Sequence, residues 1–190
     1  FLLYIMGVQE ALHEQMLDLQ QRLPQYKSLG VARGDGKTKG EYSAIFYDTT
    51  RFQPLQSTTF WLSLTPEVPG SKSWDAAITR IVTWAQFRDR KTKKKFFVFN
   101  THFDHVGVKA RTESAKLILQ KIKELNTSKL PVILTGDFNL TPEQEPIAVI
   151  TKELHDSRSI NKEAPYGPTG TFNGFKFDSP LKDRIDYVFV

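Results

Sequence analysis

The spacing of the apolar residues constrains the fold of this chain more than any other feature, and it changes twice along the sequence. Residues 5–10 form a short apolar run that ends in a carboxylate. Residues 11–23 then carry leucine and methionine at three- and four-residue steps, and Pro24 follows. Such steps are typical of an amphipathic helix, and proline ends one. We therefore expect a buried strand followed directly by a helix.

Between residues 26 and 99 the pattern changes to short β-type runs separated by turn residues. We expect strands at 28–32, 42–47, 52–62, 78–88 and 95–101, with breaks at 34–36 and 69–71. Short strands at this spacing favour an antiparallel sheet.

The second half of the chain returns to alternating helices and strands. We expect a helix at 108–125, a buried strand at 132–134, and a final strand at 184–190. Pro142 suits the first turn of a further helix, with Thr141 as its N-cap. Strands in both halves with helices between them predict an α/β fold, in which two packed, mainly antiparallel β-sheets are flanked by helices in a four-layer α/β sandwich.

The composition is that of one globular domain, which we expect to span residues 1–190. The chain is 39% hydrophobic and 25% charged, with 14 Phe and no repeats, which excludes a disordered or coiled-coil protein. The absence of Cys excludes disulfides, thiolate zinc sites and cysteine nucleophiles. No run approaches the roughly 20 apolar residues of a membrane span, and the opening residues lack the pattern of a signal peptide. The compartment is left open, with a periplasmic or secreted location slightly favoured.

The formal net charge of +5 is concentrated at one place in the sequence. Six cations against one carboxylate lie within residues 88–95, and these alone equal the charge of the whole chain. This run separates two apolar stretches, so we expect it to be the turn of a hairpin. A solvated loop tip is the favoured interpretation of its charge, and contact with phosphate or a membrane is the alternative.

Polar side chains stand at the downstream ends of the apolar strands. A carboxylate inside a buried strand is costly unless it meets a cation, a metal or a hydrogen-bond donor, and strand ends in an α/β sheet converge on one crevice. The residues at the strand ends are Glu10, His102, Asp104, His105, Asp137 and Asn139, and Asp186 lies inside the last strand.

A set of carboxylate, amide and imidazole groups without thiols is typical of a site for a hard cation. Such a set favours Mg²⁺, with Mn²⁺ as the alternative ion, over zinc. Magnesium leaves positions open for a substrate phosphate, and phosphate-ester hydrolysis uses sites of this kind. A zinc hydrolase that uses His102 and His105 is a competing hypothesis.

Four short motifs in this chain resemble those of the endonuclease/exonuclease/phosphatase superfamily, in the same order. They are Val-Gln-Glu at 8–10, Asn-Thr-His-Phe-Asp-His at 100–105, Thr-Gly-Asp-Phe-Asn at 135–139 and Arg-Ile-Asp-Tyr at 184–187. Each motif alone is weak evidence for the family, but four in the same order are specific to it. The form of the motifs is most similar to that of small bacterial members. The resemblance implies a metal-dependent phosphoesterase.

The resemblance also implies a role for each matching residue. Glu10 would bind Mg²⁺ and His102 would contact a phosphate oxygen. Asp137 would orient and deprotonate the attacking water, with Asn139 holding the water or the phosphate. Asp186 would support a transition-state histidine that the family carries in a later Ser-Asp-His motif.

Three further residues are candidates for substrate binding. Arg80 could contact the phosphate, Asp104 could lie near the metal or hold His102 or Arg111, and Phe172 could form a wall of the pocket, as an aromatic loop does in the family. Because no basic track is evident outside the hairpin, a small phosphate ester such as a sugar, inositol or lipid headgroup is slightly favoured as substrate. The alternatives are a nuclease acting on DNA or RNA and a noncatalytic binding module of the same fold. No protein partner is predicted.

Two elements of the family pattern are missing from the sequence. These are an early strand with an Asn that helps to position the metal, and the Ser-Asp-His motif. We therefore expect the sequence to be incomplete at both termini, and the 190 residues alone to be weakly active or inactive.

Overall fold

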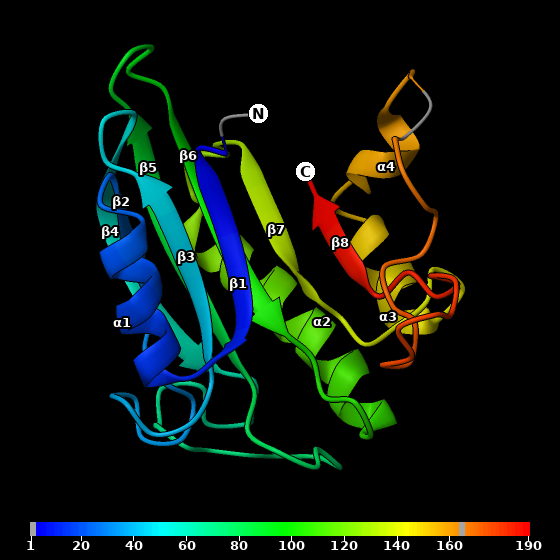
Figure 1. Ribbon diagram of the computed structural model, residues 1–190. Helices are drawn as coiled ribbons and strands as arrows, with labels where there is room; N and C mark the ends of the chain where they lie inside the picture. Colours follow the sequence, from blue (N-terminus) through cyan, green and yellow to red (C-terminus); the bar gives the residue numbers. More distant parts are fainter. Residues whose placement is uncertain (1–2, 164–165) are drawn as a thin grey trace.

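The computed structural model describes residues 3–163 and 166–190, and its strands form two β-sheets packed face to face (Figure 1). The smaller sheet has the order β1-β3-β2 and the larger one β4-β5-β6-β7-β8. All pairings are antiparallel except that of β6 with β7. The strands are β1 (Ile5–Ala11), β2 (Tyr26–Leu29), β3 (Tyr42–Asp48), β4 (Phe52–Trp61), β5 (Ile81–Asp89), β6 (Lys95–His102), β7 (Val132–Asp137) and β8 (Asp186–Phe189).

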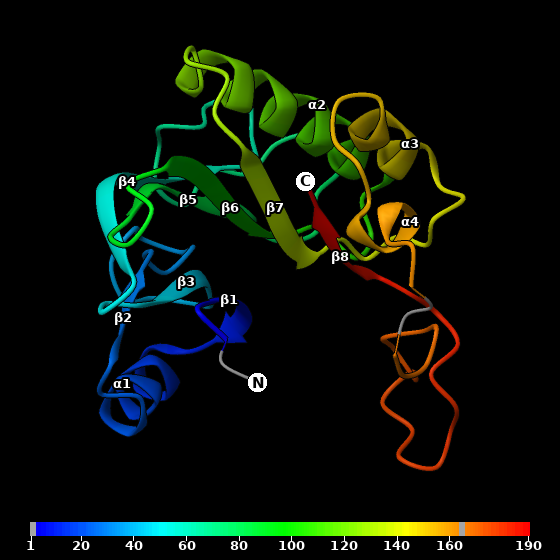
Figure 2. The same ribbon diagram turned by 90° about the horizontal axis from the view of Figure 1, so that it is seen from above.

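Helices cover the outer faces of both sheets, and Figure 2 shows the resulting layers. The helix α1 (His13–Arg22) covers the smaller sheet, where Met16 packs on Phe46 and Ala44 in one apolar cluster. The helices α2 (Val108–Leu125) and α3 (Glu145–Thr151) cover the larger sheet, and the short α4 (Ser157–Ile160) lies beside β8. The expected four-layer α/β sandwich is confirmed. No helix in the described residues is long and apolar enough to cross a bilayer.

The strands between the layers are buried on both faces. All seven residues of β3 are buried, because α1 covers one face and the larger sheet covers the other. The cluster between the sheets contains Ile45 and Tyr47 of β3 together with Ala85, Phe87 and Val98 of the larger sheet. Burial on both faces explains why these strands appear as continuous apolar runs rather than alternating ones.

A buried amide on β6 joins the two sheets. Asn100 on β6 is fully buried, and its Nδ2 donates to the carbonyl oxygens of Val8 (3.0 Å) and Ala44 (2.8 Å) in the smaller sheet. Its Oδ1 accepts from Gln9 Nε2 (2.6 Å) and Thr135 Oγ1 (2.9 Å). Two donors and two acceptor positions are the full capacity of an Asn side chain, so the group is satisfied without water.

Some of the expected boundaries were wrong by a few residues, and one helix start was wrong. The strand expected at 28–32 begins at Tyr26, and that expected at 78–88 begins at Ile81. Thr141 and Pro142 do not begin α3, which starts at Glu145 after the N-cap Gln144 and has a proline in its first turn. The reason is that Gln144 Oε1 accepts the backbone N–H of Thr141, which closes a separate turn before the helix.

The basic residues 88–95 form the turn between β5 and β6, as expected. Asp89 Oδ1 accepts the backbone N–H groups of Lys91 (2.8 Å) and Thr92 (3.2 Å), which organises the turn. Lys93 has a φ of 63°, in the left-handed region where turns of this kind usually place glycine or asparagine. A side chain in this conformation costs about 1 kcal/mol.

We expect Asn100→Ala to lower the free energy of unfolding by about 3 kcal/mol, because the buried partners of the amide lose their hydrogen bonds. Urea unfolding followed by fluorescence measures the effect. The control is Asn161→Ala, an exposed Asn for which we expect a change within about 0.5 kcal/mol. A similarly small effect at Asn100 would contradict its role in joining the sheets.

We expect Lys93→Gly to raise the free energy of unfolding by about 1 kcal/mol, because glycine adopts the left-handed conformation without strain. Lys94→Gly removes the same charge at a neighbouring position that has no positive φ, so it should not stabilise the protein. Equal stabilisation by both variants in thermal unfolding would show that charge repulsion, and not backbone strain, is relieved.

Candidate active site

A β-bulge at the end of β1 positions Glu10. The register between β1 and β3 shifts between Val8 and Ala11, so Glu10 has no partner in the ladder. Its φ of 62° lies in the left-handed region, and its Oε1 lies 3.9 Å from His102 Nδ1. Bulges of this kind re-aim a side chain beside a site, and the backbone strain is held by the surrounding sheet.

The parallel pairing of β6 with β7 brings the next two residues together. His102 and Asp137 are register partners at the C-terminal ends of these strands, and His102 Nε2 lies 3.5 Å from Asp137 Oδ2. Gly136 lets the strands approach this closely, since a Cβ at this position would lie 2.2 Å from the carbonyl oxygen of Thr101. On the other side of β7, Asp186 is the register partner of Asp137.

Asn139 fixes the orientation of both catalytic candidates. It also has a left-handed φ of 50°, and its backbone N–H donates to Asp137 Oδ1 at 2.8 Å. Its Nδ2 donates to the carbonyl oxygen of Phe103 and contacts His102 Nε2, both at 3.0 Å. Because only the amide nitrogen can donate to a carbonyl, Nε2 must be the acceptor, and the imidazole proton lies on Nδ1, toward Glu10.

Burial and charge tune the two titrating groups in opposite directions. Burial, together with the cations Arg80 and Arg33, lowers the pKa of His102 to about 3, so its imidazole is neutral at pH 7. Burial raises the pKa of Asp137 to about 6, and the carboxylates of Asp186 and Glu10 act in the same direction. A carboxylate with this pKa is suited to accept a proton near neutral pH.

Glu41 is a member of the site that the sequence analysis missed. Ligand atoms of Glu10, Glu41 and His102 all lie within 4.8 Å of one another. Glu41 immediately precedes β3, and because β3 runs antiparallel to β1, its beginning lies beside the end of β1. The sequence pattern used above identifies polar residues that follow a strand. Glu41 precedes its strand, so this pattern does not identify it, although the start of β3 and the end of β1 lie side by side.

The donor set of this group fits a hard divalent cation. Glu10 and Glu41 supply carboxylate oxygens, which Mg²⁺ and Mn²⁺ prefer. His102 offers the Nδ1–H proton rather than a lone pair, since its Nε2 is engaged by Asn139. The two carboxylates would therefore hold the ion. His105, which the zinc hypothesis requires, is not a member of this group in the described part of the chain.

Arg80 is the buried cation of the site. It is 4% exposed, its Nη2 lies 3.2 Å from His105 Nδ1, and its Nε lies 3.8 Å from Asp104 Oδ2. Its Nε and Nη1 make no hydrogen bond within the described residues. Burial lowers the pKa of Arg80 to about 10, which leaves it charged at pH 7. A buried guanidinium with free donors is suited to bind an anion.

Asp104 lies behind Arg80 rather than facing the substrate space. Its carboxylate accepts the backbone N–H groups of Ile78, Val106 and Gly107, and these bonds lower its pKa to about 2 against the effect of burial. Its backbone carbonyl accepts from Arg111 Nη1. Asp104 therefore holds the loop after β6 in place.

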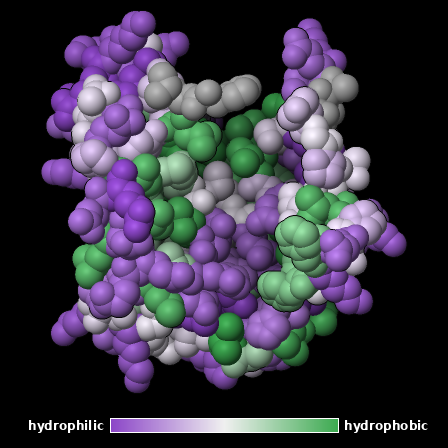
Figure 3. All heavy atoms as spheres, in the orientation of Figure 1, coloured by the Kyte–Doolittle hydropathy of each residue, from purple (hydrophilic) through white to green (hydrophobic). Residues whose placement is uncertain are grey.

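These residues surround one cavity of about 350 Å³. Figure 3 shows a hollow on this face with hydrophilic residues in its lower part. Phe172, Phe175, Ile78 and Ile185 supply an apolar wall. Neither Asp104 nor Asp186 lines the cavity. The polar lining consists of Glu10, Glu41, Arg80, His102, His105, Asp137 and Asn139.

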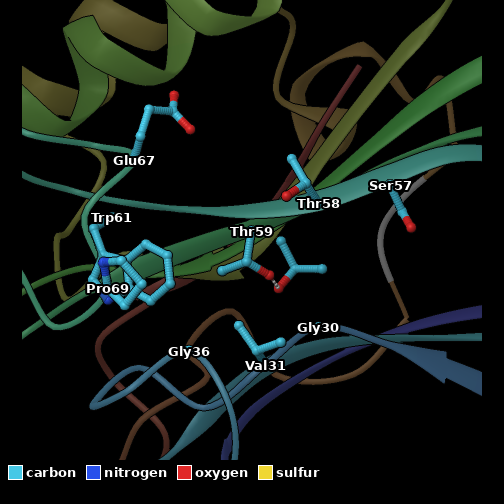
Figure 4. A pocket seen from close by; sticks show the side chains of 10 residues that line it. Gly30, Val31, Gly36, Ser57, Thr58, Thr59, Trp61, Glu67 and Pro69 are labelled. Atoms are coloured by element: carbon cyan, nitrogen blue, oxygen red, sulfur yellow. Dashed lines mark hydrogen bonds between the residues drawn. The ribbon is translucent and has the colours of Figure 1, made fainter.

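A second hollow, of about 450 Å³, lies between the loop after β2 and the edge strand β4 (Figure 4). Ser57, Thr58 and Thr59 form one wall, and Gly30 and Val31 form the other. Thr59 Oγ1 is hydrogen-bonded to Thr83 Oγ1 at 3.0 Å, so these two hydroxyl groups of the lining already have a partner in the protein. None of the expected site residues lines this hollow, which leaves the smaller cavity as the candidate active site.

The chain was then compared with known proteins. The model of the endonuclease/exonuclease/phosphatase family matches residues 2–190. The chain belongs to this family. The match confirms the resemblance expected from the four motifs, and members of the family are phosphoesterases that generally depend on divalent metals.

Two solved bacterial structures are similar over almost the whole chain. An endonuclease/exonuclease/phosphatase protein of Bacteroides vulgatus is 43% identical with a TM-score of 0.94, covering 98% of this chain and 72% of its own. A mannosyl-6-phosphatase of Bacteroides thetaiotaomicron is 45% identical with a TM-score of 0.93, covering 97% and 70%. An uncharacterised protein of Acanthamoeba polyphaga mimivirus is 30% identical over 129 residues, 66% of this chain. The chain spans 47% of the length of that relative.

We expect Asp137→Asn to stabilise the metal-free protein at pH 7.5 by about 1 to 2 kcal/mol. The folded-state pKa of Asp137, about 6, lies well above the usual pKa of an aspartate, so folding favours the protonated form and is opposed by ionisation at higher pH. The gain should vanish below about pH 3, where the carboxyl is protonated in both the folded and the unfolded chain.

Thermal unfolding in the presence of EDTA at the two pH values measures this effect. Asp178→Asn, at an exposed position, is the control and should leave the melting temperature unchanged at both. A melting temperature of Asp137→Asn equal to that of the unmodified protein at pH 7.5 would show that Asp137 is not destabilised by its surroundings.

Proposed function

We propose that this protein hydrolyses small phosphate esters by the attack of a water molecule that Asp137 activates. The observation that carries the proposal is the convergence of Asp137, Asn139, His102, the two carboxylates and Arg80 on one cavity. None of the other cavities described for residues 3–163 and 166–190 brings together an equivalent of the Asp137 base, the buried Arg80 and the two carboxylates that could hold a metal ion.

Asp137 is the base in this proposal. Its Oδ1 is held by the backbone N–H of Asn139, which leaves Oδ2 to accept a proton from water. Its raised pKa matches the requirement for a base that works near neutral pH. Because Asn139 also holds His102, the water and the phosphoryl group would be aligned by one small set of rigid residues.

His102 and Arg80 stabilise the negative charge of the phosphoryl group. The neutral imidazole of His102 is a hydrogen-bond donor through Nδ1, and Arg80 has buried donors, Nε and Nη1, that make no hydrogen bond to the residues that the structure describes. Donors that already point at the position of developing charge lower the barrier without reorganisation. Asp186, the register partner of Asp137 on β8, keeps its predicted role as support for a histidine that stabilises the transition state.

Glu10 and Glu41 would hold the divalent cation, with Mg²⁺ preferred and Mn²⁺ as the alternative. When bound, this ion supplies positive charge to the phosphoryl oxygens. Glu41 also forms an ion pair with Arg33, whose Nη1 lies 2.7 Å from Glu41 Oε2.

The surroundings of the cavity favour a small substrate over a polynucleotide. Its volume of about 350 Å³ lies in the range of small-ligand pockets. The concentrated positive charge of the chain lies on the β5–β6 turn and not beside the cavity. The apolar wall of Phe172 and Phe175 suits the face of a sugar ring. A sugar phosphate is therefore the proposed substrate, and the similarity to a mannosyl-6-phosphatase supports it.

The test is the release of inorganic phosphate from mannose 6-phosphate by the full natural chain, with and without Mg²⁺. We expect Asp137→Ala to lower kcat roughly 100-fold or more, as loss of a general base does. Glu10→Gln and Glu41→Gln should each raise the Mg²⁺ concentration needed for half-maximal rate.

Glu14→Gln, on the exposed side of α1, is the matched control and should leave the rate unchanged. Activity that survives Asp137→Ala would remove the assignment of the base. Cleavage of an oligonucleotide in preference to the sugar phosphate would replace the proposed substrate class with nucleic acid.

A further inference from the structure

The turn between β5 and β6 carries a dense cluster of unpaired positive charge. Five of the six residues from Arg90 to Lys95 are cationic, and all six are exposed. Within residues 3–163 and 166–190, none of these cations forms an ion pair. We call residues 90–95 the basic tip.

The carboxylates at this end of the sandwich do not neutralise the basic tip. Asp89 is 7% exposed, and its Oδ2 accepts from Arg51 Nη2 at 2.8 Å while its Oδ1 binds backbone N–H groups of the turn. Asp48 is also buried, and it accepts from the backbone and hydroxyl of Thr50. Both acids are turned inward, so the tip presents only positive charge to its surroundings.

The backbone of the basic tip is strained at one of its lysines. Lys93 adopts a left-handed conformation in which glycine or asparagine would be easier to accommodate. A turn selected only for stability would not place a lysine there. A positive charge placed at a conformational cost favours a use for the charge itself.

The basic tip is too far from the cavity to attract the substrate. Lys95 of the tip and His102 lie at the two ends of β6, seven residues apart, a length of about 23 Å at roughly 3.3 Å per residue. Figure 1 shows the turn rising beyond the ends of β1, β3 and β7, at the opposite end of the strands from the site. Since charges are screened beyond about 8 Å at physiological salt, the tip and the site act independently.

We infer that the basic tip binds the anionic headgroups of a phospholipid surface, with the active-site end of the sandwich directed away from the membrane. All the lysines of a protruding turn can contact a flat surface at the same time, and each lysine near an anionic membrane adds to the binding free energy. Nucleic acid recognition would instead need cations spread along a groove. In Figure 3 the protruding turn at the upper left is hydrophilic on the face shown, which fits adsorption to headgroups rather than insertion.

The experiment is co-sedimentation of the full natural chain with vesicles of phosphatidylcholine alone, or of phosphatidylcholine with roughly 30% phosphatidylglycerol. We expect binding to the anionic vesicles only, and its loss at about 0.5 M salt. The triple variant Lys91→Gln, Lys94→Gln, Lys95→Gln should bind at least about tenfold more weakly. The control removes the same charge elsewhere, through Lys72→Gln, Lys109→Gln and Lys152→Gln, and should bind as the unmodified protein does.

Two further readouts separate this inference from its rivals. Lys93→Gly should weaken vesicle binding while raising the melting temperature, which a purely structural turn would not do. Hydrolysis of a soluble phosphate ester should be the same in the triple variant as in the unmodified protein, so failure of the proposed function does not affect this result. Equal binding to neutral vesicles, no binding to either kind, equal loss in both triple variants, or tighter binding to duplex DNA than to anionic vesicles would each overturn the inference.

Discussion

The hydrogen bonds of the buried Asn100 amide are the constraint on which the site depends. Its four partners lie on β1, β3 and β7, and each is within a few residues of a site residue: Val8 and Gln9 precede Glu10, Ala44 follows Glu41, and Thr135 precedes Asp137. Asn100 itself precedes His102 on β6. One satisfied amide thus sets the relative position of four strand ends in two sheets. A small shift between the sheets would break several of these bonds at once, and this cooperativity gives the site a single geometry.

The site concentrates features that oppose stability. Glu10 and Asn139 both have left-handed backbone conformations, and Asp137 is destabilised as a carboxylate. Arg80 has buried donors without partners in the described part of the chain. In the proposed hydrolysis each feature has a use: aiming a carboxylate, orienting an imidazole, binding an anion and raising the basicity of a carboxylate. The apolar clusters on both faces of the larger sheet provide the rigidity that holds these groups in place. Such a distribution of strain is expected where function and stability compete.

The two ends of the sandwich have opposite electrostatic designs. At the site end, cations and carboxylates are partly buried and face each other across a small cavity, so their interactions are strong and weakly screened. At the other end, the lysines of the basic tip are exposed and the nearby acids are turned inward, so their field acts only at short range on what lies outside. The strands keep the two regions apart. Binding at one end and chemistry at the other can therefore be varied independently.

The sequence by itself determined the elements and most of the chemistry, because both depend on local pattern. The steps of apolar residues predicted α2 with its observed bounds, and polar residues after apolar strands identified Glu10, His102, Asp137 and Asn139, which the structure brings to one cavity. Tertiary structure alone decided the rest. Glu41 joins the site because antiparallel pairing returns the start of β3 to the end of β1, and Asp104 leaves it because three backbone N–H groups bind its carboxylate. The directions of side chains, the burial that shifts their pKa values and the tautomer of His102 all arise from contacts between residues distant in sequence, which local pattern does not encode.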